Sequence, residues 1–239
     1  SKVVCDASGN LYVGCNSISN TAGLQRFTKA TNTWTNITPS GLDARVPDLE
    51  LSSTGRFHVI CGYYNTAAGS AGYRYTDNPA TVSSGTWTSP ATTFPTQYNV
   101  AIESNGNTLY ALPSNSAWGV PTIYKSTNGG ANWAATGATP AFTSGQAWYC
   151  MAVAIDPNNA NNVIVGSLDC YKTTNGGTSW TKISEWVGTT GQYVHADQQI
   201  ITWRSNNQVL VGSDGGVHYS ANGGTNFTDK NTGLRIKQF

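Results

Sequence analysis

The chain has 239 residues, and only 10% of them are Asp, Glu, Lys or Arg, against about 25% in an average soluble domain. Its formal net charge is +1, and it has no run of like charges, so the electrostatic footprint of a nucleic-acid-binding protein is missing. No apolar stretch approaches the roughly 20 residues that a membrane-spanning helix needs. We therefore expect neither a nucleic-acid partner nor membrane insertion.

Short segments with alternating apolar residues follow one another in five groups along the chain. Each group holds a first strand, a turn rich in Gly, Asn or Pro, a second strand and then a third. The predicted first strands are residues 3–6, 48–52, 99–103, 151–156 and 199–204. The second strands are residues 11–14, 57–60, 109–112, 163–166 and 209–212, and the third strands are residues 23–27, 72–75, 122–125, 170–172 and 217–219. A fourth strand is expected to begin at an aromatic residue after each third strand.

A turn sequence, Ser/Thr-x-Asn-x-Gly-x-x-aromatic, closes the last three groups, at residues 126–133, 173–180 and 220–227. Its closing aromatics, at positions 133, 180 and 227, lie 47 residues apart both times. Gly tolerates positive φ and Asn hydrogen-bonds its own backbone, so Asn-Gly is a strong hairpin signal. We assign a structural role to the residues that define the pattern: Ser126, Asn128, Gly130, Trp133, Thr173, Asn175, Gly177, Trp180, Ser220, Asn222, Gly224 and Phe227.

The first two groups lack the complete turn sequence but keep an aromatic residue at the corresponding place. These are Trp34 and Trp87, and the aromatic spacing is 53 residues from Trp34 to Trp87 and 46 residues from Trp87 to Trp133. The fixed position in the repeat predicts that Trp34, Trp87, Trp133 and Trp180 all belong to the core.

The turn sequence resembles the Asp-box, or BNR repeat, of sialidase-like and related secreted β-propellers, here with Asn in the Asp place. The resemblance implies an all-β propeller of four-stranded blades. Five blades are visible, with approximate limits 2–40, 47–90, 97–137, 147–184 and 195–230, and residues 234–239 look like the first strand of a further blade. We therefore expect residues 1–239 to form one propeller domain or a portion of one, with further blades of the same polypeptide outside the numbered chain. A five-bladed ring is the alternative.

The chain also begins in a way that favours a longer polypeptide, since residues 1–4 resemble the inside of a strand and not a signal peptide. Its five cysteines have no C-x-x-C spacing, so no metal site and no cofactor is predicted. Cys150 with Cys170, or Cys15 with Cys61, could form a disulfide in an oxidising compartment. Cys5 belongs to neither pair, and the odd number of cysteines leaves at least one thiol unpaired within the chain.

The densest polar cluster lies at residues 193–199 and continues at 212–217. Strand alternation would place His195, Asp197 and Gln199 on one side of the first strand. Residues 195–239 resemble a block in large secreted BNR proteins that are often labelled glycosyl-hydrolase-like, including surface proteins exported by the type IX route. Those proteins commonly have His where this chain has Gln199.

Three interpretations of this cluster stay open. Asp197 or Asp214 could be one of the two carboxylates of a glycosidase. Alternatively, a carbohydrate could be bound by stacking and hydrogen bonds, and the candidate binding residues are His195, Asp197, Tyr193, Trp186, Trp148 and Trp118. In the third interpretation His195 and Asp197 only tie the strand to its neighbour and Asp214 caps a Gly-rich turn.

We favour a secreted or cell-surface module that binds glycan or a surface protein, because no complete catalytic constellation can be assembled from these residues. The alternative is a glycoside hydrolase that acts on a polysaccharide. Such an enzyme would be xyloglucanase-like and not a true sialidase, because the chain lacks the Arg-Ile-Pro motif of sialidases and has only three glutamates: Glu50, Glu103 and Glu185. Whether the chain is an enzyme is left undecided by the sequence.

Overall fold

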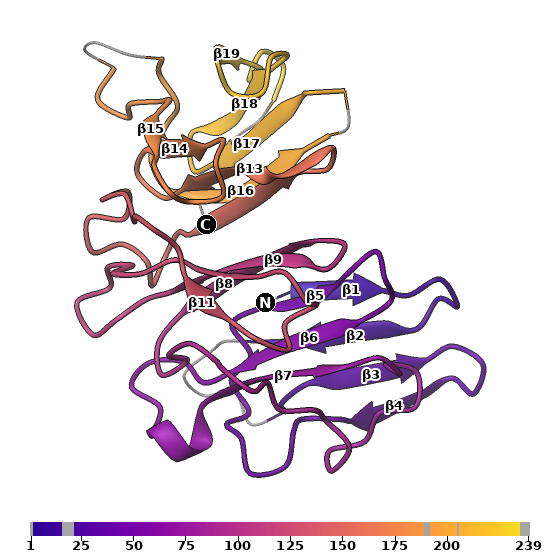
Figure 1. The fold of residues 1–239 in the computed structure, drawn as a ribbon. Helices are drawn as coiled ribbons and strands as arrows, with labels where there is room; N and C mark the ends of the chain where they lie inside the picture. The colour runs from indigo at the N-terminus through magenta and orange to yellow at the C-terminus, as the bar shows by residue number, and fades with distance from the viewer. Residues whose placement is uncertain (1, 16–21, 189–191, 205, 235–239) are drawn as a thin grey trace. The chain divides into compact units, whose positions relative to one another are not determined.

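The computed structural model describes residues 2–15, 22–188, 192–204 and 206–234, and nearly all of its regular structure is β (Figure 1). The first sheet contains β1 (Lys2–Cys5), β2 (Leu11–Gly14), β3 (Gln25–Thr28) and β4 (Thr33–Asn36), and the second contains β5 (Leu49–Leu51), β6 (Phe57–Cys61) and β7 (Gly72–Thr76). The third contains β8 (Val100–Asn105), β9 (Thr108–Pro113), β10 (Tyr124–Ser126) and β11 (Ala134–Ala135). The fourth contains β12 (Ala152–Asp156), β13 (Asn159–Gly166), β14 (Cys170–Thr173) and β15 (Thr181–Lys182). The fifth contains β16 (Gln198–Trp203), β17 (Val209–Ser213), β18 (Gly216–Ser220) and β19 (Thr228–Asp229).

In every sheet the strands pair antiparallel with their neighbours in sequence, so each sheet is a simple meander. The prediction of an all-β chain with propeller-like blades is confirmed at this level, and ring closure stays a prediction. The second sheet departs from the expected four strands. A single bridge between Tyr75 and Thr88 stands where the fourth strand was expected, because residues 78–86 are taken up by turns. The proposed first strand of a further blade, residues 234–239, lies outside the described residues except for Leu234.

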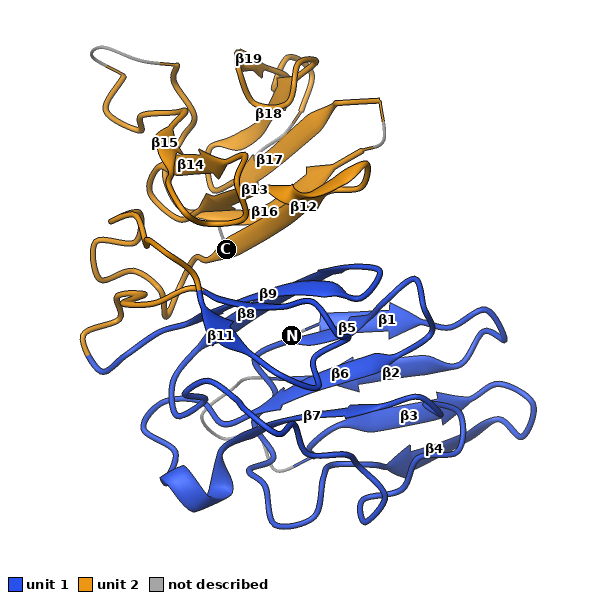
Figure 2. Ribbon diagram, viewed as in Figure 1, with its two compact units in different colours: residues 1–116, 124–135 blue, residues 117–123, 136–239 orange. Residues whose placement is uncertain are grey.

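The chain divides into two compact units (Figure 2). Unit 1 comprises residues 1–116 and 124–135 and holds the first three sheets, whereas unit 2 comprises residues 117–123 and 136–239 and holds the last two. Within unit 1, successive sheets bury two apolar layers, one around Tyr12, Leu49 and Phe57 and the other around Tyr73 and Trp133. Within unit 2, β12 and β16 lie side by side over a layer that includes Ile164 and Trp203. The core of each unit is therefore made where one sheet faces the next.

The three Asn-Gly-Gly turns share one hydrogen-bond pattern. In the first, the Ser126 Oγ accepts a bond from the Gly130 N–H at 2.9 Å and donates one to Asn128 Oδ1 at 3.0 Å. Asn128 Oδ1 also accepts from the Asn132 N–H at 2.9 Å. The turns that begin at Thr173 and Ser220 repeat these three bonds with the corresponding atoms. Both glycines of each turn have positive φ, which explains why the sequence needs Gly there.

The tryptophans of the repeat are not all buried. Trp133 is 5% exposed, as predicted for a core residue, and Trp87 and Trp180 are less deeply buried. Trp34 is 57% exposed, so its prediction as a core residue is wrong. The physical reason is its place on the edge strand β4, on a sheet face that also carries the exposed Val3 and does not face the second sheet.

Neither suggested disulfide is present in the described structure. Cys61, Cys150 and Cys170 are buried thiols, and burial raises the pKa of each to about 12. In the described part of the chain, no helix is long and apolar enough to span a membrane.

Candidate functional site

In unit 2, two aromatic residues at the end of one loop lie beside a carboxylate. The Tyr149 hydroxyl donates a hydrogen bond to Asp214 Oδ2 at 2.5 Å, and Gln199 Nε2 lies 3.4 Å from Asp214 Oδ1. The ring of Trp148 packs against that of Tyr149 with 5.4 Å between centroids. Trp148 is 49% exposed and Tyr149 38% exposed. We call Trp148, Tyr149, Asp214 and Gln199 the aromatic shelf.

Backbone contacts and an unusual conformation connect a further candidate residue to the shelf. The Ala147 N–H donates to the Trp118 carbonyl at 3.0 Å, which ties the loop before the shelf to the loop that contains Trp118. Trp118 and Ser144 both have positive φ, at 56° and 44°. Positive φ is a genuine outlier for a bulky residue such as Trp and often marks a functional position. The two loops that present Trp118 and Trp148 are therefore held together.

The second candidate carboxylate contacts the same short segment. The Cys150 thiol donates to Asp197 Oδ1 at 3.4 Å and lies 3.1 Å from the hydroxyl of Ser167. Because burial raises the pKa of Cys150, the thiol keeps its proton and can act as a donor. Tyr149 and Cys150 are adjacent in sequence, so the structure brings Asp214 and Asp197 to two neighbouring residues.

His195 has a packing role and does not share a strand face with Asp197. Strand β16 begins only at Gln198, Asp197 has a φ of 61°, and the pairing is irregular between Gln198 and Ile200. The predicted alternation of residues 195, 197 and 199 is therefore wrong. The His195 Nδ1 lies 2.9 Å from the carbonyl oxygen of Ala196, and its ring covers Gly215 so closely that a Cβ there would lie 2.2 Å from the ring.

Trp186 and Tyr193 lie along a different feature of unit 2. A bridge pairs Glu185 with Tyr193, and the Trp186 N–H donates to Asp169 Oδ1 at 3.1 Å. The ring of Tyr193 meets the buried His218 edge-on at 5.7 Å. Both aromatics are nearly half exposed. Glu185 also lines a cavity of about 360 Å³, together with Lys182, Ile183 and Gln192 among others.

Unit 1 contains a cluster of charges that sequence reasoning missed. Lys2 Nζ lies 2.8 Å from Asp48 Oδ1 and 3.6 Å from Glu50 Oε2. The Ser104 hydroxyl donates to Glu50 Oε1 at 2.7 Å, and the Ile102 N–H donates to Asp48 Oδ2 at 2.8 Å. Lys2 belongs to β1, Glu50 to β5, and Ile102 and Ser104 to β8, while Asp48 directly precedes β5. Strands β1, β5 and β8 are the first strands of three successive sheets. The sequence carries one signal for this cluster: Glu50 and Glu103 lie 53 residues apart, close to the repeat length.

The pKa values within this cluster follow from burial and charge. Burial, helped by the Glu50 carboxylate, raises the pKa of Glu103 to about 8. Burial also raises the pKa of Glu50 against the opposing effect of Lys2. For Lys2, the lowering effect of burial is outweighed by Asp48 and Glu50, so its pKa is raised. The cluster thus holds a cation firmly charged beside an acid that binds its proton near neutral pH.

The described residues contain no group of three or more His, Cys, Asp or Glu side chains arranged to hold a metal ion. No protein-family model and no curated protein sequence matches the chain. Solved structures do match. A crystal structure of an ancestral GH74 enzyme aligns with 98% of this chain at a TM-score of 0.68 and 19% identity. The extracellular domain of a one component system from B. thetaiotaomicron aligns with 91% at a TM-score of 0.63 and 13% identity.

This similarity establishes the fold and leaves the activity open, because identity is low. The chain spans 31% of the length of the GH74 enzyme and 27% of that of the extracellular domain. Both matched chains are thus more than three times as long as this one.

Proposed function

We propose that the chain is part of a secreted or cell-surface β-propeller that binds a polysaccharide through the aromatic shelf of unit 2. The observation that carries the proposal is the pair of exposed rings, Trp148 and Tyr149, with the Tyr149 hydroxyl hydrogen-bonded to Asp214. Aromatic rings with apolar faces and a polar edge stack against sugar rings, and a few placed polar groups then fix orientation.

The chemistry of the shelf suits a neutral glycan chain. Asp214 and Gln199 offer carboxylate acceptors and amide donors for sugar hydroxyls, while Trp148 and Tyr149 offer stacking surface. Trp118 extends this surface on the neighbouring loop. His195 packs against Gly215, the neighbour of Asp214, and Asp197 accepts a hydrogen bond from Cys150, the neighbour of Tyr149.

The structural similarities support the choice of ligand and location. One similar structure is a GH74 enzyme and another is an extracellular domain, which supports a polysaccharide ligand and an extracellular site of action. Xyloglucan is the candidate polysaccharide, because the sequence resembles xyloglucanase-like proteins. Asn-Gly-Gly turns at repeat spacing support Asp-box blades, and further blades of the same polypeptide would complete the propeller.

One observation favours glycoside hydrolysis as a second candidate function. Asp197 and Asp214 contact the adjacent residues Cys150 and Tyr149. Glycosidases place their two carboxylates about 5 to 10 Å apart, on either side of the glycosidic bond, and Asp197 and Asp214 are the candidate pair. In such an enzyme one carboxyl would donate a proton to the leaving oxygen and the other would act as base or nucleophile.

The test is affinity electrophoresis and calorimetry of the full chain with xyloglucan, cellulose oligosaccharides and unrelated polysaccharides, with reducing-sugar release measured in parallel. We expect binding that Trp148→Ala weakens about fivefold or more, since one stacking contact contributes about 1 kcal/mol or more. Trp34→Ala is the matched control, because Trp34 is an exposed tryptophan of unit 1, at 57% against 49% for Trp148.

The outcomes separate the candidates. Binding that both tryptophan variants reduce equally would contradict the shelf. Sugar release that is lost in Asp197→Asn or Asp214→Asn would establish the hydrolase. If no glycan binds, a protein partner at the cell surface becomes the better explanation.

A further inference from the structure

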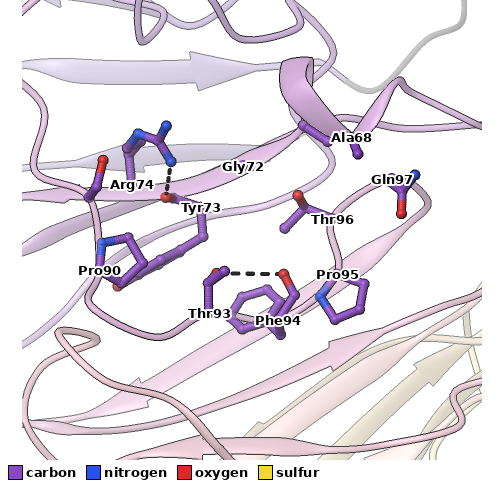
Figure 3. Close-up of a pocket in the computed structure, with 12 residues that line it drawn as sticks. Ala68, Gly72, Tyr73, Arg74, Pro90, Thr93, Phe94, Pro95, Thr96 and Gln97 are labelled. Atoms are coloured by element: carbon purple, nitrogen blue, oxygen red, sulfur yellow. Dashed lines mark hydrogen bonds between the residues drawn. The ribbon is translucent and has the colours of Figure 1, made fainter.

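Besides the cavity of unit 2 that Glu185 lines, a cavity lies in unit 1. None of its lining residues belongs to the charged cluster or to the aromatic shelf. Its volume is about 320 Å³, and it lies between strand β7, the short helix η1 (Ala68–Ser70) and the segment 89–97 (Figure 3). Figure 3 shows Arg74 at one end of the pocket and Thr96 and Gln97 at the other, with Thr93 and Phe94 between them.

The guanidinium of Arg74 differs from those of the other half-buried arginines in the described structure. Arg45 is paired with Asp43, and Arg56 is paired with Asp77. Arg26 donates to two backbone carbonyls, those of Pro79 and Val82. Arg74 donates one hydrogen bond, from Nη1 to the Tyr73 carbonyl at 2.8 Å, and no described carboxylate lies within ion-pair distance of it. Most of its five N–H donors are therefore left for a ligand.

The pocket is built of parts that the core holds in place. Phe94 and Tyr73 are both buried, and their rings lie 5.6 Å apart. The Thr66 N–H bonds the Gln97 carbonyl at 3.0 Å, which fixes the segment that carries Thr96. Gly72 leaves room for the guanidinium, because a Cβ there would lie 2.8 Å from Arg74 Nη1. A ligand would thus meet a preformed site, which lowers the entropic cost of binding.

We propose that this pocket binds a uronic acid, with Arg74 holding the carboxylate. The planar guanidinium matches a carboxylate with two parallel N–H···O bonds. Thr93, Thr96 and Gln97 supply hydroxyl and amide groups for the ring hydroxyls, and the faces of Phe94, Pro90 and Pro95 supply apolar walls. The volume lies at the lower end of the range for small-molecule sites, which suits one sugar ring.

This site is independent of the aromatic shelf, so it stands or fails separately from glycan binding in unit 2. The experiment is NMR titration of the full chain with glucuronate and galacturonate, with glucose and the methyl ester of glucuronic acid as neutral counterparts of similar size. We expect chemical-shift changes at the amides of 93–97 with the uronates and at least tenfold weaker effects with the neutral sugars, because a charge-assisted bidentate contact is lost.

Variants test the role of Arg74. Arg74→Gln should weaken uronate binding at least tenfold while the spectrum stays dispersed, and Arg74→Lys should give an intermediate loss because it keeps the charge without the fork. Arg204→Gln is the matched control, since Arg204 is an exposed arginine of unit 2, and Trp148→Ala should leave uronate binding unchanged. The proposal is overturned if no uronate binds, if the ester binds as well as the acid, if a sugar sulfate binds equally, or if Arg74→Gln has no effect.

Discussion

The two units each gather carboxylates, but they surround them with different groups. In unit 1, Asp48 and Glu50 face the ammonium of Lys2 and accept further bonds from Ile102 and Ser104. In unit 2, Asp197 and Asp214 are held by a neutral thiol and a neutral phenol, beside exposed aromatic rings. In unit 1 the ammonium of Lys2 compensates carboxylates on neighbouring strands, whereas in unit 2 the two carboxylates lie near exposed aromatic rings. We therefore expect substitutions in the first cluster to change stability, and substitutions in the second to change the glycan binding that we propose.

The Asn-Gly-Gly turns of the two units also differ, in the groups that they pack against. In unit 1 a Cβ on Gly130 would lie 1.8 Å from the buried Tyr73 hydroxyl, which is itself hydrogen-bonded to His58 Nδ1 at 2.7 Å. In unit 2 a Cβ on Gly224 would meet the ends of Ile183 and Ile164, at 2.9 and 3.1 Å. The turn of unit 1 therefore packs against the Tyr73 hydroxyl, which its hydrogen bond to His58 holds in place.

The largest expected effect comes from Gly130→Ala. It combines a left-handed residue with a clash against Tyr73, and we expect it to lower the free energy of unfolding by about 3 kcal/mol. Gly224→Ala should cost about 1 to 2 kcal/mol, because isoleucine ends can move. Gly106→Ala is the control for the cost of positive φ alone, since Gly106 has a φ of 59° and a Cβ added there would have no atom within 4 Å. Urea unfolding of the three variants checks the order, and equal losses for Gly130 and Gly224 would remove the contrast between the turns.

Lys2→Met is expected to have the next largest effect. It leaves Asp48, Glu50 and Glu103 without their cation, and we expect a loss of about 1 to 2 kcal/mol at pH 7, since Lys2 is partly exposed to solvent. Lys230→Met, at an exposed position of unit 2, should change the free energy of unfolding by less than about 0.5 kcal/mol. Similar effects of both substitutions in chemical unfolding would show that the cluster of unit 1 does not stabilise the fold.

The pH dependence of stability provides a smaller and more specific test of the same cluster. A carboxyl whose pKa is raised on folding binds its proton more tightly in the folded state than in the unfolded chain. Since the pKa of Glu103 rises from 4.5 to about 8, the free energy of unfolding should fall as pH increases through that interval and level off above it. Glu103→Gln should remove this slope and stabilise the protein at pH 8 by about 1 kcal/mol or more. Thermal melts at pH 5 and pH 8 measure the difference, and an unchanged slope in the variant would mean that another group titrates.

The smallest stability change is expected for Asp214→Asn. The amide oxygen of the new side chain would still accept a hydrogen bond from Tyr149, so we expect the melting temperature to shift little. Glycan binding should nevertheless weaken severalfold, because a neutral acceptor forms weaker bonds with sugar hydroxyls. Calorimetry and thermal melts on the same sample separate the two effects. A large loss of stability with unchanged binding would place Asp214 with the structural carboxylates.

The local structure of this protein could be predicted from its amino-acid sequence. Residues that are neighbours along the chain specify the strand positions and the fivefold repeat. They also specify the turns in which a residue such as Ser126 hydrogen-bonds to Asn128. Backbone conformation depends mainly on such neighbours, so patterns of alternation and Asn-Gly pairs predict it well. The fourth strand of the second sheet did not follow this rule: Tyr75 forms a single bridge with Thr88, because turns take up residues 78–86.

Which residues are buried, and which charged groups come together, depends on the packing of one sheet against another. Trp34 and Trp133 occupy the same place in the repeat, yet only Trp133 has another sheet packed against it. Lys2, Glu50 and Glu103 lie about 50 residues apart in sequence and come together only because the first strands of three sheets are neighbours in unit 1. The left-handed Asp197 likewise breaks an alternation that the sequence suggested. Burial and charge pairing depend on contacts between distant segments, and no pattern of adjacent residues records them.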